Sequence, residues 1–303
     1  MKLEKIRISD KEVMPFTIPS GIVMTDPRCA ARILNINPFI GIWTTKSIGP
    51  EPRKGYREPI FAKYAPGSYV NAVGLTNPGC EEFARELASA DIPKDRFILT
   101  SIFGANSGEF VKVVKTLEGL VDGFELNLSC PHVQGHGMLL GQDKVIVYEI
   151  TNSVVSCTKK PVFVKLTPNA INIGEIAKAA ISAGAYGIAA INTVGPGLYM
   201  VDEHPVLTNQ VGGLSGRAIR PIGLKCVREI RQAIGEKPVI IGMGGIECGR
   251  DVLDYKIVGA NAFGIGSALI GMKDDYIPSY IDVVIREAEE GNHETSDCAL
   301  NYL

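Results

Sequence analysis

A short apolar run in the middle of the chain ends in side chains that could do chemistry. Residues 123–128 read Gly-Phe-Glu-Leu-Asn-Leu, and a serine, Cys130, a proline and His132 follow directly. Residues 133–143 carry three glycines and show neither a helical nor a strand period. Reactive groups on a loop held by a rigid scaffold are a common way to build a site. The run therefore indicates a strand that delivers Asn127 and Cys130 to a site.

Cys130 is the candidate catalytic residue of this stretch. A thiol with an ordinary pKa near 8.5 can serve as a general base where its surroundings favour the thiolate. A small buried residue without reactivity is the alternative, because that is how most free cysteines behave. His132 would assist the thiol or be an ordinary loop histidine, and spacing alone leaves both open.

Seven further apolar segments end in polar or small residues in the same way. Their ends hold Ser20, Lys46, Ser101, Lys165, Asn192, Thr193, Gly244, Gly245, Gly266 and Ser267. Eight strand–helix units in about 300 residues are typical of a TIM (β/α)8 barrel, whose active sites lie at the C-terminal ends of the strands. An open doubly wound sheet is the alternative, but it would concentrate the site at one switch point.

We therefore predict an α/β fold in which residues 1–303 form a single barrel domain, with a small N-terminal hairpin over residues 1–15. Residues 48–77 and 194–214 are rich in glycine and proline, and we predict long loops there, at the C-terminal face. Loops of that length in a compact domain are usually functional.

Several features of this face predict anion binding. The glycines that end the seventh and eighth strands, with Gly213-x-x-Gly216 before a helix, are typical of a barrel phosphate site, although either pair alone would be an ordinary turn. Gly74, before a predicted helix, permits a turn whose N–H groups form an anion nest, and is otherwise unremarkable. Lys165 ends a buried strand. It could be an ordinary lysine exposed to solvent at a strand end, or a fixed cation that stabilises the negative charge of a reduced cofactor ring. The same two interpretations apply to Lys46.

Composition excludes several classes of protein. The net charge is −2 without a basic block, which argues against nucleic-acid binding. The seven cysteines include no C-x-x-C pair, so we expect neither a metal nor an iron–sulfur site in this chain, and scattered thiols fit a reducing cytoplasm. The charged N-terminus and the lack of a long apolar run predict no signal peptide and no membrane association.

The chain resembles the dihydroorotate dehydrogenases, within the wider FMN barrels that include the pyrimidine-reducing domain of dihydropyrimidine dehydrogenase. The resemblance runs from Pro19-Ser20-Gly21 to Gly266-Ser267. Its most specific motifs are Asn71-Ala-Val-Gly-Leu-x-Asn-Pro-Gly79, Glu125-Leu-Asn-Leu-Ser-Cys-Pro131, Lys165-Leu-Thr-Pro168, Ile191-Asn-Thr193, Gly212-Gly-Leu-Ser-Gly216 and Gly242-Met-Gly-Gly-Ile246.

This resemblance implies one FMN per barrel and a pyrimidine substrate. The flavin ring and ribityl chain would be surrounded by Ser20, Gly21, Lys46, Ser47, Ser101, Asn127, Lys165 and Ile191. Its phosphate would be held by Gly216, Gly244, Gly245, Gly266 and Ser267. The pyrimidine would be bound by Lys46, Asn71, Val73, Gly74, Leu75, Asn127, His132, Asn192 and Thr193. Cys130 would take the proton from C5 of dihydroorotate while hydride passes from C6 to the flavin.

The resemblance is to class 1, which uses cysteine as the base, and within it to type 1B. That type acts in pyrimidine (UMP) biosynthesis. It passes electrons to a separate subunit that carries FAD and an iron–sulfur cluster and uses NAD. The other possibility is an enzyme with flavin alone that uses fumarate as the acceptor. We expect a homodimeric core. His132 stands where the family usually has asparagine, and a histidine there resembles dihydropyrimidine dehydrogenase, so uracil or thymine reduction is the alternative. The loop from Asn71 to Leu75 resembles the carboxylate-binding loop of the orotate enzymes and favours dihydroorotate. A phosphate-binding barrel without redox chemistry, with Lys165 as a Schiff-base residue, is the third hypothesis.

Overall fold

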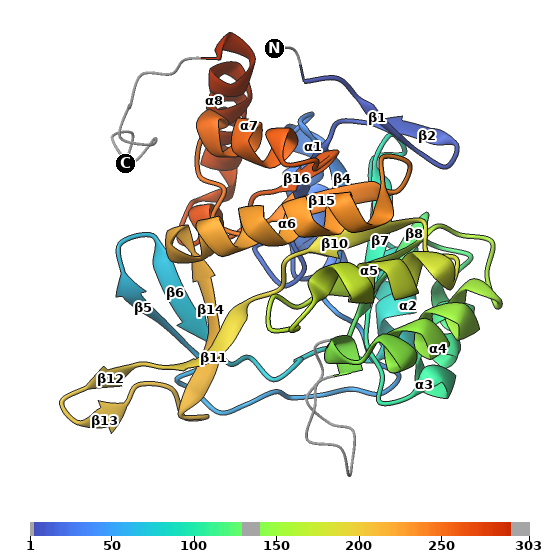
Figure 1. The fold of residues 1–303 in the computed structure, drawn as a ribbon, viewed down its shortest axis with the longest axis horizontal. Coiled ribbons are helices and arrows are strands. Elements are labelled where there is room, and N and C mark those ends of the chain that lie inside the picture. The colour runs from blue at the N-terminus through green and yellow to red at the C-terminus, as the bar shows by residue number, and fades with distance from the viewer. Residues whose placement is uncertain (1–2, 129–139, 292–303) are drawn as a thin grey trace.

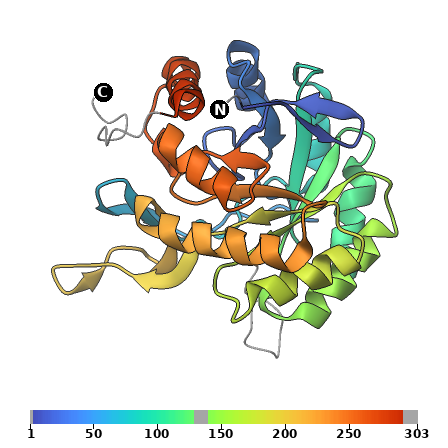
Figure 2. The same ribbon diagram turned by 45° about the horizontal axis from the view of Figure 1, so that its top comes forward.

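The computed structural model describes residues 3–128 and 140–291, and these form a closed barrel of parallel strands wrapped by helices (Figures 1 and 2). The barrel strands are β3 (Phe16–Ile18), β4 (Ile40–Thr44), β7 (Phe97–Ile102), β8 (Gly123–Asn127), β9 (Val162–Leu166), β10 (Gly187–Ala190), β15 (Val239–Met243) and β16 (Ala262–Gly264). The last strand pairs with the first, Phe263 with Phe16, so the sheet has no open edge. The predicted TIM barrel is confirmed, and the open sheet is excluded.

Helices follow the strands and cover the outside of the barrel. They are α1 (Pro27–Ile36), α2 (Cys80–Ala88), α3 (Ser107–Leu117), α4 (Lys144–Val155), α5 (Ile173–Ser182), α6 (Arg220–Ile234), α7 (Gly249–Ile257) and α8 (Ile277–Glu290), with short 3₁₀ turns η1 (Leu140–Gln142), η2 (Arg217–Ile219), η3 (Ser267–Leu269) and η4 (Asp274–Tyr276). The carboxylate of Asp26 accepts hydrogen bonds from two backbone N–H groups and begins α1, with Pro27 at the first helical position. None of the helices in the described residues is both long enough and apolar enough to cross a bilayer.

The N-terminal hairpin closes one end of the barrel. Strands β1 (Ile6–Ile8) and β2 (Lys11–Val13) pair antiparallel, and Ile8 and Val13 pack against side chains of the barrel interior such as Phe97 and Phe163. This confirms the predicted capping hairpin. Because the interior is filled with apolar side chains at this end, a ligand can enter the barrel only from the opposite face.

The two predicted loops contain strands, and in this respect the prediction was wrong. β5 (Phe61–Ala65), β6 (Ser68–Asn71), β11 (Val194–Leu198) and β14 (Val211–Gly216) form a four-stranded antiparallel sheet, and β12 (Met200–Val201) pairs with β13 (His204–Pro205) in a projecting arm (Figure 1). The strands β11 and β14 are short, largely exposed or half-buried and rich in glycine, so they lack the apolar alternation that identifies a strand. The pairing of β6 with β14, which lie more than a hundred residues apart, joins the two segments into one sheet.

Candidate active site

A cavity of about 560 Å³ lies at the C-terminal ends of the barrel strands. This volume falls within the range of small-molecule and cofactor sites. The residues around it come from the ends of seven barrel strands, all except β7, and from the antiparallel sheet. Those that the sequence singled out are Ser20, Gly21, Lys46, Ser47, Asn71, Val73, Leu75, Asn127, Lys165, Ile191, Asn192, Thr193, Gly216, Gly244, Gly245, Gly266 and Ser267.

A chain of hydrogen bonds joins polar side chains across neighbouring strand ends. The Ser47 hydroxyl lies 3.1 Å from that of Ser20 and 2.9 Å from that of Ser101. The Asn127 amide donates to Ser47 Oγ at 3.0 Å, and the Asn192 amide donates to Asn127 Oδ1 at 3.3 Å. Each group is therefore oriented by a neighbour, which preorganises the wall of the cavity toward a ligand.

Two lysines face the cavity in different electrostatic settings. Lys46 is half-buried, its amine makes neither a hydrogen bond nor an ion pair with the described residues, and burial lowers its pKa. Lys165 is buried, with its Nζ 3.6 Å from Oε1 of the buried Glu125. The cavity thus offers one lysine that lacks a counter-charge among the described residues and one that has a buried carboxyl group beneath it.

Glycine turns form another part of the wall, after β15 and at the end of β14. Gly244 and Gly245 have φ of +126° and +73°, conformations that side chains disfavour. An added Cβ at Gly245 would lie 2.7 Å from the carbonyl oxygen of Gly216, so the two turns approach closely only because side chains are absent. The Tyr255 hydroxyl fixes this arrangement by donating to the Gly244 carbonyl at 2.8 Å, and burial raises its pKa. Such exposed backbone at helix beginnings suits a phosphate.

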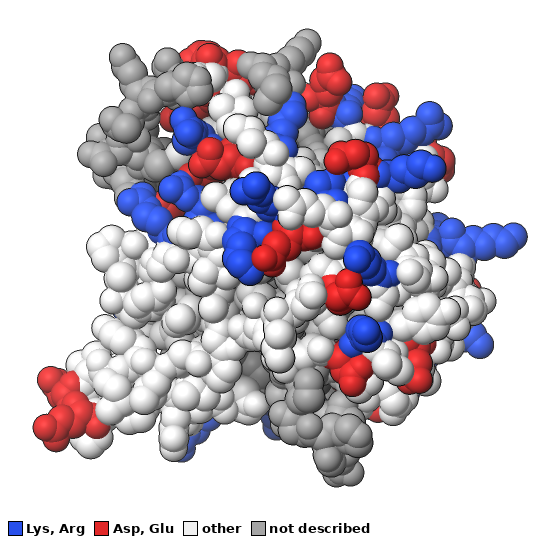
Figure 3. Space-filling view, viewed as in Figure 1, with Lys and Arg blue, Asp and Glu red and all other residues white. Residues whose placement is uncertain are grey.

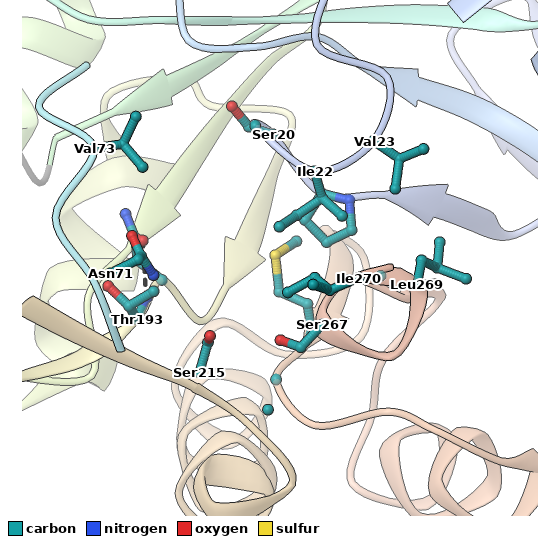
Figure 4. Close-up of a pocket in the computed structure, with 18 of the residues that line it drawn as sticks. Ser20, Ile22, Val23, Asn71, Val73, Thr193, Ser215, Ser267, Leu269 and Ile270 are labelled. Atoms are coloured by element: carbon teal, nitrogen blue, oxygen red, sulfur yellow. Dashed lines mark hydrogen bonds between the residues drawn. The ribbon is translucent and has the colours of Figure 1, made fainter. Parts of the chain in front are cut away.

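The polar residues are divided between two sides of the cavity. In Figure 4, Asn71 and Thr193 lie close together on one side, whereas Ser267 lies across the cavity, beside Leu269 and Ile270. Asn71 is held by β6–β14 pairing and by a hydrogen bond of 3.4 Å from its amide to the Gly213 carbonyl. The separation suits an elongated ligand with an anionic group at one end and a polar ring at the other.

The structure brings together most, but not all, of the predicted site residues. Ser101 is fully buried and reaches the cavity only through Ser47. Gly74 packs against Tyr56, while its neighbours on both sides face the cavity. Cys130 and His132 lie outside the described residues, so their predicted roles stay predictions.

Sequence reasoning missed the apolar part of the wall. These residues are Ile22, Val23, Ile219, Met243, Leu269, Ile270 and Met272. Several lie one to five residues beyond a barrel strand end, where the chain turns back over the cavity. Position after a strand was the available signal, but apolar side chains there look like ordinary core.

The fold and the cavity define a TIM-barrel enzyme with a preorganised polar wall and glycine turns at the strand ends. The dihydroorotate dehydrogenase family model matches residues 8–287. The chain therefore belongs to the dihydroorotate dehydrogenase family.

Individual relatives agree with the family match, and the three described here are each named dihydroorotate dehydrogenase B (NAD(+)), catalytic subunit. The Thermoplasma volcanium protein is 44% identical over 86% of this chain and 84% of its own length. The Pyrococcus horikoshii protein is 42% identical over 84% of this chain and 82% of its own length. The Methanocaldococcus jannaschii protein is 40% identical over 92% of this chain and 90% of its own length.

Proposed function

We propose that this chain is the catalytic subunit of a cytoplasmic enzyme that oxidises dihydroorotate to orotate with a bound FMN. The observation that carries the proposal is the lining of the cavity, which combines glycine turns, three asparagine amides and Lys46, a lysine without an ion pair among the described residues. The relatives' names support the reaction, and the five described cysteines, all free, support a reducing compartment.

The donor set fits FMN on grounds that the structure supplies. The glycine turns of β14 and β15, with Gly266 and Ser267 after β16, would hold the phosphate through backbone N–H groups. The serine and asparagine chain would line the isoalloxazine ring and ribityl group, and Lys165 would lie opposite the charge that the ring gains on reduction. FMN would supply the acceptor for the hydride that leaves C6 of the substrate.

Around the pyrimidine, the chain's own residues bind and orient. The side-chain amides of Asn71, Asn127 and Asn192 can each donate and accept, which matches the alternating N–H and C=O groups of the ring. Lys46 would pair with the substrate carboxylate, because it is the cavity cation that lacks a partner among the described residues. With the ring held by hydrogen bonds at its edge and by the ion pair at its carboxylate, the C5–H and C6–H bonds would be oriented for cleavage.

Cys130 would act as the general base, although it lies outside the described residues. Its thiolate Sγ would take the proton from C5, and the electrons of the C5–H bond would form the C5=C6 double bond as hydride leaves C6. The residues before it, Asn127 and Leu128, fix where the chain leaves the strand, since Gly141 N donates to the Leu128 carbonyl at 2.9 Å.

Titration of the yellow holoenzyme tests the substrate. Orotate is expected to shift the flavin absorbance at lower concentration than uracil, since only orotate carries a carboxylate for Lys46. Anaerobic mixing with dihydroorotate should then bleach the flavin. A shift with uracil but not with orotate would contradict the proposal, and a protein that takes up no FMN would indicate a non-redox barrel.

We further propose that electrons leave through a separate NAD-linked subunit carrying FAD and an iron–sulfur cluster. The names of the relatives contain both NAD(+) and the words catalytic subunit. Co-purification tests this: a protein with FAD and iron–sulfur absorbance should accompany the native chain and confer dihydroorotate-dependent NAD+ reduction. Rapid turnover of the isolated chain with fumarate would point to the other acceptor.

We also propose that two copies pair through the antiparallel sheet and its arm. Figure 3 shows a wide face with few charged side chains around β5, β11 and β14, apart from the acidic residues at the arm tip. Leu198, Met200 and Val201 are 58%, 42% and 47% exposed there, and apolar patches of this kind mark interaction surfaces. Leu198→Asp should convert a dimer to a monomer by light scattering, whereas Ile171→Asp, in the exposed turn before α5, should not. A dimer in both variants would refute this interface.

A further inference from the structure

Glu125 is a buried carboxylate that the proposed reaction does not use. It lies in the middle of β8 and has no solvent exposure. Neither of its oxygens has a hydrogen-bond partner among the described residues. Its charged neighbour is Lys165, whose Nζ lies 3.6 Å from Oε1. The pair is therefore close enough for strong electrostatic coupling but too far apart for a good hydrogen bond.

The position of Glu125 follows from the strand geometry. Side chains alternate along a strand, so Glu125 points to the same side as Asn127, which faces the cavity. Two residues of a strand rise about 6.6 Å, so Glu125 lies one side-chain layer beneath the cavity wall. In the register of the barrel, Asn127 stands beside Lys165, and Glu125 stands beside Phe163. The carboxylate thus lies under the lysine, away from solvent.

Such a pair is a poor device for stabilising the fold. Removing two charges from water is expensive, and apolar residues of similar size often stabilise a protein as well or better. A carboxylate without hydrogen bonds receives little compensation besides its charged partner. Its effect on Lys165 is different, because a buried negative charge opposes the positive potential that the lysine creates in the cavity.

We propose that Glu125 is an ionised positioning residue that holds Lys165 and lowers the reduction potential of the bound flavin. The inference rests on the proposed function, in which Lys165 faces a ring that becomes anionic on reduction. Lys165 alone favours the reduced ring. The negative charge of Glu125 offsets part of that preference and keeps the flavin able to pass its electrons on.

The reduction potential of the holoenzyme tests the charge of Glu125. Glu125→Gln keeps the shape and removes the charge, and should raise the ratio of affinities for reduced over oxidised FMN about tenfold. For a two-electron couple this is a rise of about 30 mV. Glu149→Gln, on the exposed side of α4, is the matched control and should leave the potential unchanged. An unchanged potential in Glu125→Gln would overturn the proposal, because it would mean that the native carboxyl is already neutral.

Unfolding of the apoprotein tests the pair without any flavin. Lys165→Met should lower the midpoint of thermal unfolding, because it strands a buried carboxylate, and adding Glu125→Gln should restore part of the loss. If the fall in the unfolding midpoint of the double variant equals the sum of the falls in the two single variants, the pairing is refuted. Glu125→Met, which needs no hydrogen bond, serves both measurements if the glutamine variant does not fold. A protein that binds no FMN would count against the proposed function. The unfolding experiment would still show whether Glu125 and Lys165 interact, because it uses the apoprotein.

Discussion

Lys46 offers the sharpest test of how the cavity recognises its substrate. The side chain faces the cavity after β4, is half-buried, and makes no ion pair or hydrogen bond with the described residues. A ligand carboxylate would supply the missing counter-charge. Lys46→Met keeps the aliphatic stem and removes the charge, so it isolates the electrostatic contribution.

A hydrogen bond to a charged group contributes about 1.5–3 kcal/mol, and a loss of about 2 kcal/mol weakens binding about 30-fold. The dissociation constant of orotate, measured from the flavin absorbance of the reconstituted holoenzyme, should rise by this factor. Uracil has the same ring without the carboxylate and should lose little. Lys115→Met, on the exposed face of α3, is the control and should bind both ligands normally.

The pH dependence gives an independent check on the same residue. Burial lowers the pKa of Lys46 below the usual value of about 10.4. An anionic ligand binds the protonated amine, so orotate affinity should be full below the pKa of Lys46 and fall as the pH rises through it. The fall should come at a lower pH than for an exposed lysine and be absent in Lys46→Met. Equal losses of orotate and uracil affinity would refute the carboxylate assignment.

Three further substitutions test the wall, the anion site and the base. Tyr255→Phe removes the donor to the Gly244 carbonyl; it should lower the free energy of unfolding by about 1 kcal/mol and weaken FMN binding by fluorescence titration, and an unchanged FMN affinity would contradict this. Ser101→Ala removes a partner of Ser47; we expect a shifted flavin spectrum and about fivefold slower reduction, whereas an unaltered spectrum would remove Ser101 from the site. Cys130→Ser should slow flavin reduction by dihydroorotate by about 10² to 10⁴ near neutral pH, with partial recovery at higher pH, and normal kinetics would exclude Cys130 as the base.

The barrel and the strand-end residues could be predicted because one physical pattern encodes both. Parallel strands buried on both faces read as continuous apolar runs, and the polar residue after each run marks the point where burial ends. Closure into a barrel then gathers those ends on one face. This is why Ser20, Lys46 and Asn192, which are far apart in the chain, could be assigned to one site from their sequence positions.

The antiparallel sheet and the true position of Ser101 could not be predicted in this way. The strand Val194–Leu198 contains Gly-Pro-Gly, and its order comes from pairing with β14, which no local pattern reports. Ser101 ends a barrel strand as the active-site residues do, yet its hydroxyl turns toward Ser47 and not the cavity. Which of two polar strand ends touches a ligand depends on side-chain packing across strands.

Strand β8 shows how a two-residue spacing can separate electrostatic control from ligand contact. Glu125 and Asn127 point to the same side of the strand, but only Asn127 reaches the cavity. Asn127 also joins the hydrogen-bonded chain through Ser47 and Asn192, so its loss should disturb ligand binding directly. Glu125 acts on the cavity only through the charge of Lys165. Neutralising Glu125 should therefore change the flavin potential while leaving orotate affinity nearly unchanged, whereas Asn127→Ala should weaken orotate binding.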